Sequence, residues 1–102
     1  MGESLPSISA SESLVLDLLE SAERFGLELV EASEGRIKRG SVYVTLGRME
    51  AKGFVQSRVE VRAPNTPGLP RRLYRATTYG LKVRDAYRIL RDALALKPAE
   101  AR

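Results

Sequence analysis

Apolar residues near the start of the chain recur at the spacing of an amphipathic helix, in which residues three and four apart share one face. The residues on that face are Leu14, Val15, Leu18, Leu19 and Ala22. Ser9 and Glu12 have the spacing of a capping box, in which two side chains satisfy free N–H groups at a helix start. The pattern therefore predicts a helix over residues 10–23. A second, shorter helix is expected after a break at Gly26, ending near residues 33–35.

Residues 41–52 carry two stripes, which together predict a third helix. The apolar stripe has the i, i+4, i+7 spacing of a helix that buries one face, and consists of Val42, Leu46 and Met49. The polar stripe lies roughly a quarter turn away, and consists of Ser41, Thr45, Arg48 and Lys52. Gly53 then ends the helix, because glycine adopts the left-handed backbone conformation without a Cβ penalty. Taken alone, the polar stripe is most simply a face in contact with water.

Beyond this helix the hydrophobic pattern changes its period. Apolar and polar side chains alternate over residues 54–62, which predicts a strand. The next segment, APNTPGLP at residues 63–70, holds three prolines and a glycine, a composition that predicts an exposed loop. Residues 72–76 are again compatible with a strand. The two strands are therefore expected to pair as a hairpin around the loop.

The last stretch of the pattern predicts a helix that Thr77 or Thr78 can cap. Its apolar stripe consists of Val83, Tyr87, Leu90 and Leu94. Four more apolar residues widen the stripe to nearly half the circumference: Ala86, Ile89, Ala93 and Leu96. One small domain cannot cover so wide an arc. The arc therefore predicts a contact with a second copy of the chain, with the first helix as the docking surface.

Three helices, a two-stranded hairpin and one more helix predict a fold class that is mainly α with a small β-hairpin (α+β). This order is that of a winged helix-turn-helix, here with a C-terminal dimerisation helix. One domain is expected over residues 10–97, with the dimerisation helix at residues 78–97. A flexible N-terminus, residues 1–9, precedes the domain, and a frayed tail, residues 98–102, follows it.

The winged helix-turn-helix suggests a use for the polar stripe. In that architecture the helix before the hairpin enters the major groove of DNA, and the hairpin loop lies along the backbone or in the minor groove. Residues 41–53 would then be the recognition helix, and residues 63–72 a basic wing.

Composition narrows the classes of function. A chain of 102 residues is near the size at which one hydrophobic core suffices. The chain has no cysteine and no histidine, and so lacks the commonest nucleophile, general base and zinc ligands. Neither a signal-peptide pattern nor a run of 18 apolar residues is present. We therefore expect a soluble, cytoplasmic protein that is not an enzyme, uses no cofactor or metal, and does not enter a membrane.

The net charge of +4 conceals a segregation of charge along the chain. Residues 1–35 contain eight acidic residues and one basic residue, whereas residues 36–88 contain thirteen basic residues and three acidic ones. A basic side attracts polyanions, either nucleic acid or an anionic membrane. Ten of the thirteen basic residues are arginine, which suits bidentate contacts with phosphate and guanine. Duplex DNA is therefore the favoured partner.

Three stretches, in this order, resemble the PadR-like transcriptional regulators: FGLELV at residues 25–30, SVYVTLGRMEAKGFVQSR at 41–58 and LPRRLYRATTYG at 69–80. The family typically has an aromatic-Gly pair, then Leu-Tyr-Pro, Leu, Arg-Leu-Glu and Gly-Leu around the recognition helix, then Pro-Arg, Tyr, and Thr with Gly three residues on. Val44 takes the usual proline position here. The resemblance covers about residues 14–94. It implies a homodimeric, repressor-type DNA-binding protein of the compact branch, whose short last helix supports dimerisation.

The residues expected to bind DNA lie on the recognition helix, just before it and beside the wing: Lys38, Arg39, Ser41, Tyr43, Thr45, Arg48, Lys52, Arg71 and Arg72. Alternatives stay open for some of them. Tyr43 either reaches a phosphate or packs half-buried. Lys38 and Arg39 could belong to an ordinary solvated turn. The two wing arginines could protect an edge strand from aggregation.

The residues expected at the dimer interface are Leu14, Leu18, Val83, Tyr87, Leu90 and Leu94. The expected partners are double-stranded DNA and a second copy of the chain. The interface could also enclose a small-molecule effector of unknown identity. The alternative function is a winged-helix protein-interaction module whose basic side meets an acidic partner.

Overall fold

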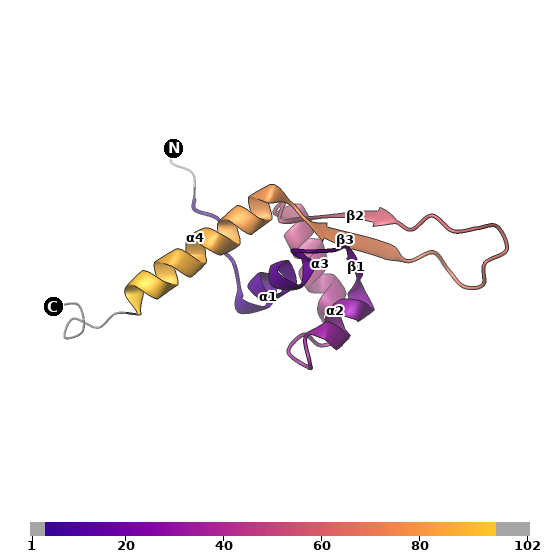
Figure 1. The fold of residues 1–102 in the computed structure, drawn as a ribbon, viewed down its shortest axis with the longest axis horizontal. Helices are drawn as coiled ribbons and strands as arrows, with labels where there is room; N and C mark the ends of the chain where they lie inside the picture. The colour runs from indigo at the N-terminus through magenta and orange to yellow at the C-terminus, as the bar shows by residue number, and fades with distance from the viewer. Residues whose placement is uncertain (1–3, 96–102) are drawn as a thin grey trace.

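The computed structural model describes residues 4–95. Within them the chain forms four helices and three short strands, in the order α1 (Ala10–Leu19), β1 (Arg24–Phe25), α2 (Gly26–Ala32), α3 (Val42–Ala51), β2 (Val55–Val59), β3 (Arg72–Ala76) and α4 (Thr78–Leu94). Figure 1 shows α1, α2 and α3 gathered on one side of the sheet. The loop between β2 and β3 projects from one end of the molecule and α4 from the other. The predicted fold class is confirmed.

The sheet contains three antiparallel strands in the order β1-β3-β2. β2 and β3 pair along their whole length, which confirms the predicted hairpin. β2 ends at Val59, although the alternating pattern predicted a strand as far as residue 62. Val61 is 93% exposed. Apolar side chains at this end of the hairpin gain no burial, so they do not extend the strand pairing.

β1 is a two-residue strand that the hydrophobic pattern did not predict. Arg24 lies opposite Tyr74 and Phe25 lies opposite Leu73, so β1 covers the second edge of β3. Two residues are too few to show a period, and the pattern therefore carried no signal for this pairing. The pairing holds the start of α2 beside the base of the hairpin.

α1 begins as predicted and ends earlier than predicted. The capping box is confirmed, because Ser9 Oγ accepts the N–H of Glu12 at 3.1 Å and Glu12 Oε1 accepts the N–H of Ser9 at 2.9 Å. The helix ends at Leu19 rather than four residues later, since the chain must turn to place Arg24 in the sheet. The Arg24 side chain then donates to the carbonyl of Leu18 at 2.8 Å. That bond satisfies one of the carbonyls left without a partner at a helix end.

The predicted second, shorter helix is confirmed as α2; it begins at Gly26 itself, so the break between the first two helices lies just before this glycine. The side chain of Glu28 accepts the N–H of Phe25 at 2.7 Å and closes the start of the helix. α2 ends at Ala32, close to the predicted end. Gly26 lies in close contact with α3, because a Cβ at this position would be 2.6 Å from the ring of Tyr43.

The predicted apolar stripe of α3 forms the centre of the core. Val42, Leu46 and Met49 are completely buried. They belong to one cluster with side chains from the other three helices and the hairpin, among them Val15, Leu16, Leu29, Phe54, Val55, Tyr74 and Val83. Each such burial stabilises the fold by about 1.5 to 3 kcal/mol. The burial fixes the rotation of α3 and so decides which of its residues face outward.

α4 is a helix of 17 residues that is tied to the end of α3 through its cap. Thr77 Oγ1 accepts the N–H of Gly80 at 2.9 Å and donates to the carbonyl of Gly53 at 2.6 Å. This confirms the predicted cap at Thr77. Residues 1–3 and 96–102 lie outside the described residues, and with them the predicted end of the last helix and the predicted tail. Within residues 4–95, no helix is long and apolar enough to cross a membrane.

Candidate nucleic-acid interface

The outward arc of α3 is the first part of the candidate interface. Its exposed residues are Tyr43, Val44, Gly47, Arg48, Glu50 and Ala51. Val44 is 63% exposed, and a Cβ added at Gly47 would meet nothing within 4 Å. The centre of the arc is therefore small and apolar, with Arg48 at its edge. The predicted polar stripe lies to one side of this arc, because Thr45 is half-buried. The polar stripe predicted from the sequence does not include Val44 and Gly47, because neither has a polar side chain.

Lys52, which was predicted to contact DNA, has its ammonium group bound within the protein. Lys52 Nζ lies 3.0 Å from each carboxylate oxygen of Glu12 and 3.1 Å from the carbonyl of Ser7. The Glu12 side chain is only 1% exposed. The same carboxylate closes the capping box of α1. Glu12 therefore joins the end of α3, the start of α1 and the N-terminal segment.

Tyr43, for which the sequence left two alternatives open, lies at the edge of the outward arc. Its ring lies against Gly26, and it is nevertheless 53% exposed. The contact holds the ring at the boundary between α2 and α3, where its free side faces solvent.

The segment before α3 places the other predicted residues of this helix at the surface. Lys38, Arg39 and Ser41 are all exposed. Ser41 is the N-cap residue, but its side chain makes no cap hydrogen bond. Its hydroxyl instead donates to the carbonyl of Lys38 at 3.4 Å. Without a side-chain cap, the first-turn N–H groups of α3 present partial positive charge at the surface.

The two predicted wing arginines are oriented by contacts with other elements. The guanidinium of Arg71 lies 3.8 Å from the ring centroid of Phe25, a cation–π contact with β1. Arg72 Nη1 donates to Ser57 Oγ at 3.1 Å, and Ser57 Oγ donates to Glu50 on α3 at 2.8 Å. The base of the wing is thus connected to the recognition helix. Both arginines remain exposed.

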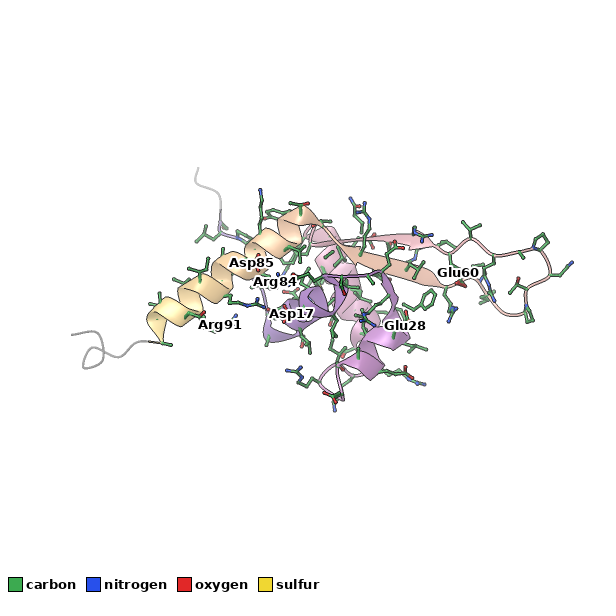
Figure 2. The ribbon with its side chains drawn as sticks, in the orientation of Figure 1. Asp17, Glu28, Glu60, Arg84, Asp85 and Arg91 are labelled. Carbon is green, nitrogen blue, oxygen red and sulfur yellow. The ribbon has the colours of Figure 1, made fainter. Side chains whose placement is uncertain are left out.

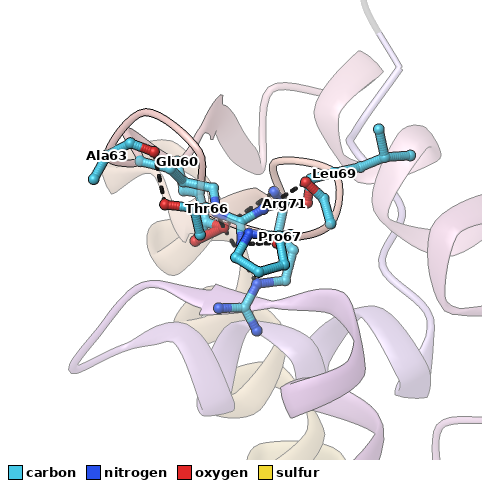
Figure 3. Close-up of polar contacts among 8 residues, drawn as sticks. Glu60, Ala63, Thr66, Pro67, Leu69 and Arg71 are labelled. Atoms are coloured by element: carbon cyan, nitrogen blue, oxygen red, sulfur yellow. Dashed lines mark hydrogen bonds and ion pairs between the residues drawn. The ribbon is translucent and has the colours of Figure 1, made fainter.

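The wing itself is organised around Glu60, labelled in Figure 3, and Arg62. Glu60 Oε1 lies 3.2 Å from Arg62 Nε and 3.4 Å from Arg71 Nε. Burial alone would raise the pKa of the Glu60 carboxyl, but the hydrogen bonds and positive charges of Arg71 and Arg62 hold that pKa below its usual value. Arg62 was not among the residues predicted to have a role. No spacing in the sequence distinguishes it from the other arginines.

The candidate dimer residues fall into three settings. Val83 belongs to the core of the single chain, where it is 6% exposed. Leu14, Leu18 and Tyr87 are half-buried against that core, and the Tyr87 hydroxyl donates to the carbonyl of Pro6 at 2.6 Å. Leu90 and Leu94, by contrast, are 51% and 74% exposed. An apolar groove of about 330 Å³ runs along α4 from Tyr79 to Leu90 and is also lined by Leu5 and Pro6.

Buried Arg84 fixes α4 to the rest of the molecule. Its guanidinium, 5% exposed, lies 3.1 Å from Asp17 Oδ1 and 2.8 Å from Asp85 Oδ1, and also pairs with Glu20. Arg88 adds a second contact with Asp17 at 2.9 Å. Figure 2 shows Arg84 between α4 and α1, beside Asp17. Acidic residues of the first third of the chain thus bind Arg84 and Arg88 of α4 and Lys52 at the end of α3. Arg48, Arg71 and Arg72 stay at the surface.

Known proteins resemble this chain in both sequence and structure. The model of the Transcriptional regulator PadR-like family matches residues 15–86. No match was found among curated proteins. A PadR family transcriptional regulator from Eggerthella lenta is 29% identical, with a TM-score of 0.69 over 82% of this chain and 73% of that chain. A PadR family transcription regulator from Clostridium difficile is 22% identical, with a TM-score of 0.67 over 85% of this chain and 96% of that chain.

A third solved structure is of Bacillus subtilis PadR in complex with operator DNA. It is 19% identical to this chain, with a TM-score of 0.69, and the likeness concerns the fold. The match covers 78% of this chain and 47% of that chain, so this chain corresponds to about half of the B. subtilis protein.

Proposed function

Because this chain belongs to the PadR-like family of transcriptional regulators, we propose that it is a DNA-binding repressor that binds a palindromic operator as a homodimer. α3 enters the major groove, and the wing follows the backbone or the minor groove. The B. subtilis relative with this fold was solved with operator DNA, which supports this assignment.

One observation carries the proposal. Tyr43 of α3 and Arg71 and Arg72 of the wing line the same surface cavity, of about 460 Å³. The recognition helix and the wing therefore border one surface, which α2 also lines with Glu28 and Glu31, so that a single duplex can touch both. A chain of contacts from Arg72 through Ser57 to Glu50 fixes the geometry of that surface.

The contacts divide into those that read bases and those that bind the backbone. Arg48 is the candidate for a base edge, because it is exposed at the edge of an arc whose centre is small enough to approach base pairs closely. Lys38, Arg39, Arg71 and Arg72 are candidates for phosphates. Ser41 and Thr45 are candidates for either kind of contact, and Tyr43 is a candidate for a phosphate contact through its hydroxyl.

Lys52 has a different proposed role. Because its ammonium is bound to Glu12, its contribution to DNA binding is to hold the end of α3 in place. The proposed dimer interface is formed mainly by the outward residues of α4, Leu90 and Leu94, which are exposed in the single chain.

The test is binding of the purified protein to random-sequence duplex DNA at several salt concentrations, followed by selection of preferred sequences. Each neutralised phosphate contributes about −0.9 to the slope of log K against log salt. With basic residues on α3 and the wing in both subunits, we expect a slope of roughly −5 to −8 on that basis. A slope shallower than about −2 would contradict the proposal. Little retention of DNA even at low salt would instead favour a protein-interaction module with an acidic partner.

A further inference from the structure

The wing loop has a defined conformation despite having almost no strand pairing. Beyond the last pair of β2 and β3, one further backbone–backbone bond joins its two sides, from the N–H of Glu60 to the carbonyl of Arg71 at 2.8 Å. Residues 63–71 are all exposed. Three prolines lower the entropy that this loop loses on ordering. They also remove N–H groups that could have formed bonds across it.

Arg62 supplies the bonds that the backbone does not. Its Nη2 donates to the carbonyl of Pro67 at 2.6 Å, and its Nη1 donates to the carbonyls of Gly68 at 3.2 Å and Leu69 at 2.7 Å. Its Nε pairs with Glu60, which lies two residues earlier on the same arm of the loop. The side chain is 21% exposed, although it lies in a surface loop. Pro67 and Leu69 are labelled in Figure 3, where dashed lines mark the polar contacts of this loop.

The loop backbone is shaped to make this convergence. The hydroxyl and the N–H of Thr66 both donate to the carbonyl of Ala63, at 2.6 and 3.3 Å, which closes a turn. Gly68 has φ of 85°, a conformation that costs glycine little and turns its carbonyl toward the guanidinium. Asn65, the other residue with positive φ in the loop, is of a type that tolerates it.

We propose that Arg62 is a positioning residue, which holds the wing in its DNA-binding shape before DNA is present and makes no phosphate contact itself. The planar guanidinium suits this role because its donors form a rigid fork, whereas a lysine ammonium is a compact point charge. Arg62 also binds the negative ends of three carbonyl dipoles. Without it, these oxygens would be free to turn toward the phosphates.

The clamp can be tested without DNA, by amide hydrogen exchange and heteronuclear NMR relaxation in the free protein. In Arg62→Ala and Arg62→Lys, the N–H groups of residues 65, 66, 68 and 69 should exchange faster and show lower order parameters. Arg58→Ala is the control, because Arg58 carries the same charge on β2 and pairs with Glu23 rather than with the wing. If the wing amides of Arg62→Ala behave like those of wild type, the clamp does not exist.

The consequence for binding rests on the proposed function and has its own measurement. The probe is a labelled, mixed-sequence duplex of about 30 base pairs, long enough for two half-sites one helical turn apart. Arg62→Lys keeps the charge, yet should bind at least about fivefold more weakly, because the wing must be ordered on binding. A phosphate contact would instead leave Arg62→Lys near wild type, and that result would overturn the positioning role. Failure of the wild type to bind the duplex would refute the proposed function, and the exchange result would still decide on the clamp.

Discussion

Arg48 and Lys52 lie one helical turn apart on α3, and their settings differ in a way that mutation can separate. Arg48 is exposed at the edge of the outward arc. If it reads a base edge, Arg48→Ala should lower binding to the selected operator by about 1 to 3 kcal/mol and lower binding to a scrambled duplex much less. Arg71→Ala, as a backbone contact, should weaken both duplexes about equally. Equal losses on the two duplexes for Arg48→Ala would make Arg48 a phosphate contact.

Lys52 should matter for folding as well as for binding. Lys52→Met removes the partner of a buried carboxylate, which typically costs about 3 to 5 kcal/mol. Because the ammonium is 29% exposed, we expect the lower end, about 3 kcal/mol in the free energy of unfolding. Denaturant titration measures this value, and Lys38→Met is the control, since Lys38 is exposed. A Lys52→Met protein that is as stable as wild type but deficient in DNA binding would restore Lys52 as a direct contact.

At the scale of the elements, the junction of α4 with the hairpin depends on one close approach. A Cβ at Gly80 would lie 2.3 Å from the carbonyl oxygen of Phe54 and 2.9 Å from its Cα. Both are backbone atoms, so Gly80→Ala must shift α4 or β2, and strain of this kind typically costs about 1 to 3 kcal/mol. Gly47→Ala is the matched control. It lies in an exposed helix with open space around it and should stabilise the fold by up to about 1 kcal/mol.

Unfolding of both glycine variants in denaturant gives the comparison directly. Equal stabilities for the two would show that α4 moves away from Phe54 without cost. The pattern of Thr77 followed by Gly80, which contributed to the resemblance with the PadR-like family, thus has a physical basis in this chain. The threonine caps α4, and the glycine lets the helix approach the chain entering β2.

The order of the elements was predictable because each long element carries a period that only one secondary structure satisfies. The apolar stripe of α3 shows such a period, and the capping box of α1 marks the start of a helix. The structure confirms both. β1 and the early end of α1 were not predictable, because they depend on pairing with β3, about fifty residues away along the chain. Local pattern contains no information about such a contact.

The candidate site was predictable as a region and less so residue by residue. The outward face of α3 and the two wing arginines follow from the fold. The partner of each basic residue does not, because a lysine that meets a phosphate and a lysine that meets a carboxylate forty residues earlier look alike in sequence. Lys52 and Arg62 both bind partners within the protein that the sequence does not show. Their partners are fixed only when α1 and the wing loop fold.

At the scale of the whole molecule, the outer half of α4 should determine the oligomeric state. Leu90 is 51% exposed in the single chain, so Leu90→Glu should leave the subunit folded while placing a charge in the proposed interface. Truncating a leucine at a closed interface costs about 2 to 5 kcal/mol, and a buried charge costs more. The variant should sediment as a monomer and lose binding to a palindromic duplex.

Val61→Glu is the control for this experiment, because it changes an equally apolar, exposed residue on the wing, outside the proposed interface. It should sediment like wild type. A Leu90→Glu protein that stays dimeric would place the interface elsewhere on the molecule.

The ion pairs of Arg84 and Arg88 attach α4 to α1 through its middle turns, whereas Leu90 and Leu94 lie in its last turns. In the proposed dimer, the anchorage of the helix and its pairing surface are therefore separate stretches of sequence. Mutations in the last turns could alter the angle between two subunits and spare the surface that touches base pairs. A lineage could then change the spacing of its operator half-sites while inheriting the same base preference. Spacing and preference would be traits on which natural selection can act independently.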